Sequence, residues 1–168
     1  MENPVEKARQ IIVSNRYLAL ATCSGETPWV AALAYAVDKD YIFYFYSAKN
    51  SLHIEHIKKN PNVAFTIYNS TLPSDEVDGL QIAGIVTQVK LIDLPRVIRL
   101  YYEQTFPDEI IRAKWKQPIS AFKDVAIKRF YQIKPIKVYK IDLSTTEVDR
   151  RIEISLEELC RYPAYSHS

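Results

Sequence analysis

Apolar residues recur at helical spacing near the start of this chain and at strand-like spacing soon afterwards. Pro4 opens a stretch whose apolar residues share one face of a helix, which predicts an N-terminal helix over residues 3–14. Three runs rich in β-branched and aromatic residues follow, and they predict strands at residues 16–24, 29–37 and 41–46. Because the turns between them are short, these strands must run antiparallel.

A basic helix comes next. Asn50 or Ser51 can cap its first turn, Asn60 followed by Pro61 ends it, and residues 62–68 predict a fourth strand.

Two strands and a helical insertion make up the second half. Residues 79–91 predict a fifth strand in which Gly84 marks a bend or bulge. Residues 130–143 predict the last strand, in which Pro135 interrupts the pairing or lies at an edge. Residues 93–116 between them have a helical pattern. Six antiparallel strands with flanking helices predict a mainly β fold, a small barrel or a sandwich.

The composition indicates a single globular domain over residues 1–168, with the barrel at about 16–143 and a C-terminal segment at 144–168 that contains one amphipathic piece. Of the 168 residues, 48% are hydrophobic and 25% are charged, which is ordinary for such a domain. The net charge of +2 predicts neither a nucleic-acid nor a membrane-surface partner.

The cysteine and glycine content narrows the class of protein further. Cys23 and Cys160 give neither a disulfide framework nor a metal spacing, and the N-terminus lacks an apolar signal core, so a cytoplasmic protein is expected. The apolar runs are strand-sized, so no membrane span is predicted. The three glycines exclude glycine-rich phosphate loops.

The polar turn at residues 47–51 is the first candidate site. Its hydroxyls, the free N–H groups of the following helix, and the nearby Lys49 and His53 suit a phosphate-sized anion. The aromatic strand before it can lie under a flat ligand, so a nucleotide-like or flavin-like molecule is the hypothesis. The alternative is an ordinary helix cap beside a solvated lysine.

Three other places can contact a planar ring, each with a plainer alternative. The small residues at 31–34 would let a ring approach the strand, or they pack beneath a helix. Gln81 can bond a ring carbonyl, or it lies on a solvent face. Trp115 can cover a ligand, or it anchors its loop.

No protein-borne catalytic or metal site is predicted. His53 and His56 are three residues apart on a helix, but no third ligand is suitably spaced, so two surface histidines are expected. Cys23 lies in a strand predicted to be buried and has no neighbouring base, and His167 lies in the polar tail. An enzyme of this sequence would therefore depend on a cofactor.

The order of these pieces resembles the pyridoxamine 5′-phosphate oxidase-like family of FMN-binding split barrels. The matching segments are the paired strands at 16–37, then YIFYFYS, SAKNSLHIEHIKKNPNVAFTIY, LQIAGIVTQV and IKPIKVYKIDL. The resemblance implies a six-stranded antiparallel split barrel with Greek-key-like connections. The helical insertion resembles a less characterised branch of the family.

The resemblance also implies a homodimer with two FMN molecules at the subunit interface. The residues that it assigns to the cofactor are Val30, Ala31, Ala32, Leu33, Tyr46, Ser47, Lys49, Asn50, Ser51, His53 and Gln81. Where the oxidase has a Ser-Arg-Lys cluster, this chain has Ser51-Leu52-His53, so Lys49 is the expected replacement cation. The Arg-rich segment that binds the pyridoxal substrate has no counterpart, so oxidase activity itself is not expected.

The favoured function is an FMN-dependent oxidoreductase that takes electrons from NAD(P)H and acts on a small molecule. The alternatives are a non-enzymatic flavin-binding or redox-sensing protein, a haem or deazaflavin binder on the same barrel, and a cofactor-free dimer.

Overall fold

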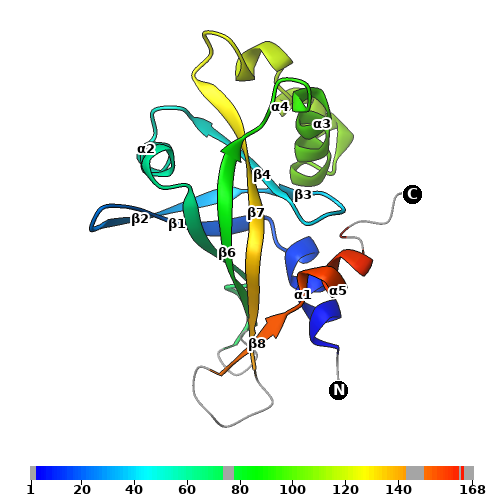
Figure 1. Ribbon diagram of the computed structural model, residues 1–168. Helices are drawn as coiled ribbons and strands as arrows, with labels where there is room; N and C mark the ends of the chain where they lie inside the picture. The colour runs from blue at the N-terminus through cyan, green and yellow to red at the C-terminus, as the bar shows by residue number, and fades with distance from the viewer. Residues whose placement is uncertain (1–2, 74–77, 143–149, 163, 165–168) are drawn as a thin grey trace.

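The computed structural model describes residues 3–73, 78–142, 150–162 and 164 (Figure 1). The strands are β1 (Tyr17–Ser24), β2 (Thr27–Ala34), β3 (Ala36–Val37), β4 (Phe43–Ala48), β5 (Asn62–Tyr68), β6 (Gly79–Gln88), β7 (Lys128–Ile141) and β8 (Arg151–Ile154). The helices are α1 (Pro4–Ser14), α2 (Leu52–Lys59), α3 (Leu94–Thr105), α4 (Glu109–Trp115), the 3-10 helix η1 (Ile119–Phe122) and α5 (Leu156–Arg161).

All of these strands belong to one antiparallel sheet. Its order is β2-β1-β5-β6-β7-β4-β3, and β8 pairs with β7. Figure 1 shows the sheet curling, with α2 on one side and α1, α5 and α3 on the other. The predicted mainly β split barrel with flanking helices is therefore confirmed, although the described residues contain eight strands rather than six.

The barrel closes at Tyr35. β2 pairs with β1 and β3 pairs with β4, so the two strands lie at opposite ends of the sheet order although one residue separates them. The Tyr35 N–H donates to the carbonyl of Arg16 at 3.2 Å, and its hydroxyl donates to the carbonyl of Ile12 at 2.5 Å. The prediction of one continuous strand over residues 29–37 is wrong because the chain changes its pairing partner here.

The third predicted strand begins and ends later than expected. Tyr41 has φ 58°, which places it in a turn rather than a strand. Asp38 holds this turn, since its Oδ1 accepts from the N–H groups of Asp40 and Ile42, both at 3.0 Å. β4 then continues through Ser47 and Ala48, which were predicted to belong to the polar turn.

The bulge predicted at Gly84 is confirmed. The register of β6 against β7 shifts between Ala83 and Gly84, and Gly84 lies opposite Pro135. A Cβ at Gly84 would lie 2.7 Å from Ile133 Cγ2 and 2.9 Å from the carbonyl oxygen of Lys134. The close approach of the two strands therefore requires glycine.

Two apolar clusters hold the molecule together. The larger one fills the barrel beneath α1, α2 and α5, with Ile12, Leu20, Phe43, Ile54 and Ile133 among its buried members. The smaller one, half of whose buried members are aromatic, lies between β4, β7 and α3. The insertion between β6 and β7 thus has its own core against the outside of the barrel.

The helical predictions are confirmed in outline. The helix expected at 3–14 is α1, and the insertion expected at 93–116 contains α3 and α4. The amphipathic piece of the C-terminal segment is a strand, β8, followed by α5. Residues 143–149, at the end of the last predicted strand and the start of this segment, and most of the tail with His167 lie outside the described residues. None of the helices in the described ranges has the length and apolar content needed to cross a bilayer.

Candidate functional site

Two hydroxyl groups and an imidazole meet where β4 leads into α2. Ser47 Oγ lies 2.7 Å from His53 Nε2 and 3.3 Å from Ser51 Oγ, and Ser51 Oγ lies 3.2 Å from His53 Nε2. We call these three side chains the hydroxyl–imidazole cluster. All three were predicted to be site residues, and the structure brings them together.

The local chain geometry leaves the N-terminus of α2 uncapped. Ser51 occupies the N-cap position, but its hydroxyl donates to the carbonyl of Ala48 at 2.9 Å and makes no cap hydrogen bond. The first N–H groups of a helix have no partner within the helix. Several backbone donors and the positive end of the helix dipole therefore lie beside the cluster, which suits an anion.

The hydrogen bonds also indicate where the protons lie. Because the Ser51 hydroxyl donates to Ala48, its oxygen can only accept from His53, and a proton on His53 Nε2 would satisfy the contacts of this nitrogen with both hydroxyls. Ser47 Oγ can then accept from the same N–H and still donate its own proton to a ligand. Burial, together with the nearby His56, lowers the pKa of His53, so the imidazole is neutral in the free protein near pH 7.

The prediction of two surface histidines is wrong. His53 is 8% exposed and His56 is 5% exposed. His56 Nδ1 lies 3.3 Å from Thr22 Oγ1 on β1, so this histidine joins α2 to the sheet. No cluster of three or more potential metal ligands among His, Cys, Asp and Glu occurs in the described part of the chain.

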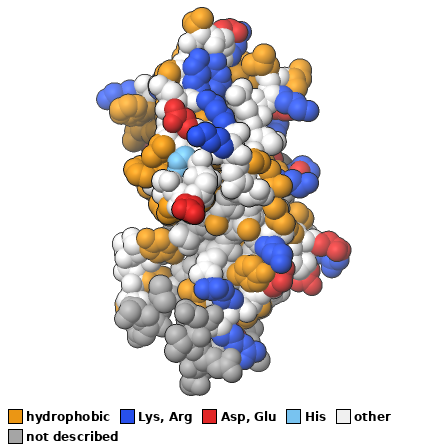
Figure 2. All heavy atoms as spheres, turned by 60° about the vertical axis from the view of Figure 1, so that its left-hand side comes forward, with side chains coloured by type: hydrophobic (Ala, Val, Ile, Leu, Met, Phe, Trp, Pro, Cys, Tyr) orange, Lys and Arg blue, Asp and Glu red, His pale blue; other side chains and the backbone are white. Residues whose placement is uncertain are grey.

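Two basic residues lie close to the cluster in the fold. Lys49 lies in the turn beside the cluster. Arg129 on β7 is in register with Ser47, so the side chains of Arg129 and Ser47 leave the sheet on the same face. Arg129 donates to the carbonyls of Asp124, Ala126 and Lys128 at 2.6–2.7 Å and fixes the loop before β7. Figure 2 shows Lys and Arg side chains gathered above a histidine on this face.

Sequence reasoning missed Arg129. It is far from Ser47 along the chain, and only the pairing of β4 with β7 makes them neighbours. Asn50, by contrast, was predicted and is exposed in the turn that leads into α2.

The second part of the predicted site lies on the outer face of the sheet. Val30 and Ala32 point outward and are exposed, whereas Ala31 and Leu33 point inward. In register, Ala32, Ala19, Thr66 and Gln81 form one row across β2, β1, β5 and β6. Val30, Ala21, Ala64 and Ala83 form the row beside it. This outer face is flat, since most of its side chains are small, and none of the described helices covers it.

Gln81 shares this face with Ala32 but is not its neighbour. Three strand spacings separate them, which amounts to roughly 14 Å. A ring centred on β2 is therefore separated from Gln81 of the same chain by the width of β1 and β5.

Tyr46 and Trp115 lie elsewhere. The Tyr46 ring packs on the opposite side of β4 from Ser47, with its centroid 5.2 Å from that of Tyr101 and 5.4 Å from that of Phe122. Trp115 is 57% exposed and stacks on Phe106 at 6.5 Å. α4 lies on the far side of β4 from α2 (Figure 1), so Trp115 does not meet the cluster of its own chain.

Comparison with known proteins establishes the family. The family model described as pyridoxamine 5′-phosphate oxidase matches residues 4–139, so this chain belongs to that family. It is 30% identical over 105 residues to the UPF0306 protein plu4501 of Photorhabdus laumondii, covering 58% of this chain and 73% of that protein.

Solved structures agree on the fold. A haem-binding protein from Mycobacterium smegmatis is similar with TM-score 0.71 and 14% identity, over 96% of this chain and 61% of that one. An FAD-binding protein from Mesorhizobium loti is similar with TM-score 0.62 and 19% identity, over 83% and 94%. The chain thus spans less than two thirds of the haem-binding protein and nearly all of the FAD-binding one.

Proposed function

We propose that this protein binds FMN between two copies of the chain and acts as an NAD(P)H-linked oxidoreductase on a small molecule. The observation that carries the proposal is the hydroxyl–imidazole cluster at the uncapped N-terminus of α2. Its donors match the needs of a phosphate monoester. Bound FMN would supply the hydride-transfer chemistry, for which the described residues offer no group of their own.

The donor set fits a phosphate in number and direction. Ser47 Oγ can donate outward, the first-turn N–H groups are free of helical partners, and His53 Nε2 can carry a proton between the two hydroxyls. Lys49 and Arg129 add positive charge nearby. Leu52 and His53 stand where the oxidase has its two cations, and Lys49 is the expected replacement cation.

The outer face of the sheet is suited to contact with a second copy of the chain. It exposes Tyr17, Val30 and Tyr68 beside rows of alanine, and such a flat, partly apolar face is suited to packing. Because Gln81 is about 14 Å from Ala32, a partner chain is the more direct source of this amide for a ring on β2. A homodimer would thereby complete the ring site.

A haem-binding function has less support from these side chains. Both histidines of α2 are buried, and His53 Nε2 is bonded to Ser47, so neither ring is presented to a haem iron in this arrangement of the side chains. The similarity to a haem-binding protein keeps haem as the second candidate.

The test is an absorbance spectrum of the purified protein before and after addition of FMN. We expect a flavin spectrum or saturable FMN binding, loss of that binding in Ser47→Ala/Ser51→Ala, and no loss in the matched control Ser120→Ala on η1. Oxidation of NADH or NADPH by the FMN-loaded protein would then support the oxidoreductase over a flavin store or sensor. A Soret band with no FMN binding would replace flavin by haem, and the absence of both would overturn the proposal.

A further inference from the structure

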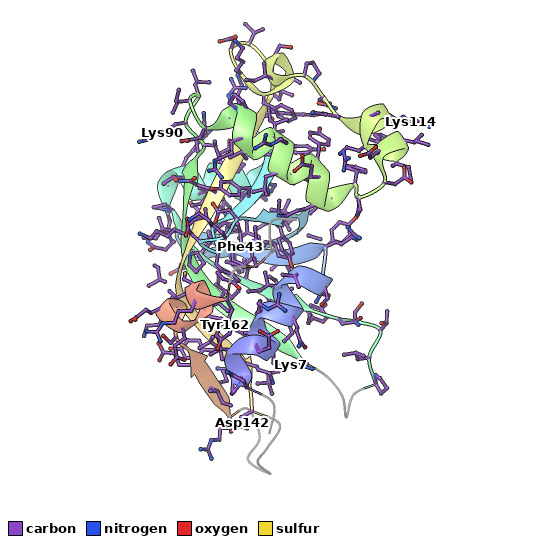
Figure 3. All side chains as sticks on the ribbon, turned by 90° about the vertical axis from the view of Figure 1, so that its right-hand side faces the viewer. Lys7, Phe43, Lys90, Lys114, Asp142 and Tyr162 are labelled. Atoms are coloured by element: carbon purple, nitrogen blue, oxygen red, sulfur yellow. The ribbon has the colours of Figure 1, made fainter. Side chains whose placement is uncertain are left out.

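A cavity lies on the other side of the barrel from the hydroxyl–imidazole cluster, between the end of α1 and α3. Its volume is about 830 Å³, within the range that small-molecule sites occupy. Figure 3 looks onto this side, with α3 above and α1 below. None of the side chains of the hydroxyl–imidazole cluster lines it, so it is separate from the proposed FMN site.

Hydrogen bonds between distant segments fix the walls of the cavity. The side-chain amide of Gln104 on α3 pairs with both backbone groups of Val37, accepting from its N–H and donating to its carbonyl, each at 2.8 Å. Arg16, in the linker after α1, donates to the carbonyl of Gln104 at 2.9 Å. Because these hydrogen bonds hold the walls in place, the cavity is a preformed site rather than a gap between mobile parts.

Asp38 and Asp40, two of the three carboxylates that line the cavity, already have partners. Asp40 Oδ1 lies 3.3 Å from Lys39 Nζ, which also lines the cavity. Asp38 Oδ2 accepts from the hydroxyl of Tyr44 at 2.8 Å and lies 3.7 Å from Arg96 Nη1. Its Oδ1 accepts two backbone N–H groups of the turn. Asp38 therefore leaves little negative charge for a ligand to meet, and Arg96 is engaged with it.

Two guanidinium groups on different elements remain available. Arg16 uses one N–H of its guanidinium group for the bond to Gln104, and a guanidinium group has five N–H donors. Arg99 on α3 has no ion pair or hydrogen bond among the described residues, and both arginines line the cavity and are exposed. Paired guanidinium groups match the oxygens of a carboxylate or a phosphate.

One free carboxylate limits the charge of the ligand. Glu103, one turn after Arg99 on α3, lines the same cavity and likewise has no partner among the described residues. It would repel a polyanion and would accept a hydrogen bond from a ligand hydroxyl or ammonium group.

We propose that this cavity binds a small organic anion, whose carboxylate or phosphate contacts Arg16 and Arg99 while Glu103 faces a hydrogen-bond donor at its other end. The site is independent of the flavin. The anion bound there would be a second small molecule that the protein recognises, either as a substrate or as an effector.

To test this, the whole protein is titrated at low salt with succinate and, separately, with glycerol 3-phosphate. Binding is measured by calorimetry or by NMR chemical-shift changes. At least one should bind saturably with Kd below about 1 mM. Arg16→Gln and Arg99→Gln should each weaken binding at least about tenfold. Glu103→Gln should strengthen binding of succinate, and Arg151→Gln on β8 is the matched control that changes nothing.

The outcomes separate this site from the cluster. Whichever anion binds identifies the carboxylate or the phosphate as the recognised group. Absence of saturable binding by both, or binding that survives both arginine variants but is lost in Ser47→Ala/Ser51→Ala, would overturn the proposal. FMN affinity should be unchanged in Arg99→Gln, so failure here leaves the proposed FMN site untouched.

Discussion

The two candidate sites of this protein are built in opposite ways. The hydroxyl–imidazole cluster comes from seven consecutive positions, Ser47 to His53, at one strand-to-helix junction. The α1–α3 cavity joins residues from the end of α1, the β3–β4 turn and α3, which are far apart in sequence. A local site can be found by its motif, whereas a site assembled by the fold can be found only from coordinates.

Their electrostatics differ as well. The cluster presents neutral donors in a half-buried corner, with His53 kept uncharged by burial. The cavity presents exposed, fully charged groups of both signs. Binding at the cluster should therefore depend on pH, whereas binding at the cavity should depend more on salt.

The largest expected effect comes from breaking the wall of the cavity. Gln104→Ala leaves the N–H and the carbonyl of Val37 without their partner, at a cost of about 1–3 kcal/mol of folding free energy. Denaturant unfolding should show this loss, and anion binding should weaken with it while FMN binding persists. An unchanged stability would mean that water replaces the amide and that the wall is not fixed by it.

A smaller effect on the free energy of unfolding is expected from lowering the pH. Since the pKa of His53 is lowered in the folded protein, the unfolded chain takes up this proton first as pH falls through about 6.5. Stability is thus fully present above that pH and declines below it. Thermal unfolding between pH 5 and pH 8 should show a shallower decline for His53→Gln; an identical decline in both proteins would assign the pH dependence to other groups.

The smallest effect concerns Arg129. Arg129→Lys keeps the charge beside Ser47 but loses the fork that holds three loop carbonyls. We expect a loss of stability on the order of 1 kcal/mol and only a slight change in FMN affinity. A large fall in FMN affinity with unchanged stability would instead make Arg129 a direct phosphate ligand.

The same contrast explains what could be predicted from the sequence. The helices, most strands and the bulge at Gly84 follow from local signals, and the residues of the cluster follow from the turn before α2. The change of pairing at Tyr35 could not be predicted, because it depends on which strands lie at the two edges of the sheet. The burial of His56 was missed since its partner Thr22 lies on β1, 34 positions away along the chain.

The central claim is that the cluster holds a phosphate, and FMN can be compared with riboflavin to test it most directly. The two molecules differ only in that group, so their affinities for the wild-type protein and for Ser47→Ala/Ser51→Ala isolate its contribution. We predict that the wild-type protein binds FMN at least about tenfold more tightly, since charge-assisted hydrogen bonds are worth about 1.5–3 kcal/mol each. In the double variant this preference should largely disappear. Equal affinities of the wild-type protein for FMN and riboflavin would contradict the claim.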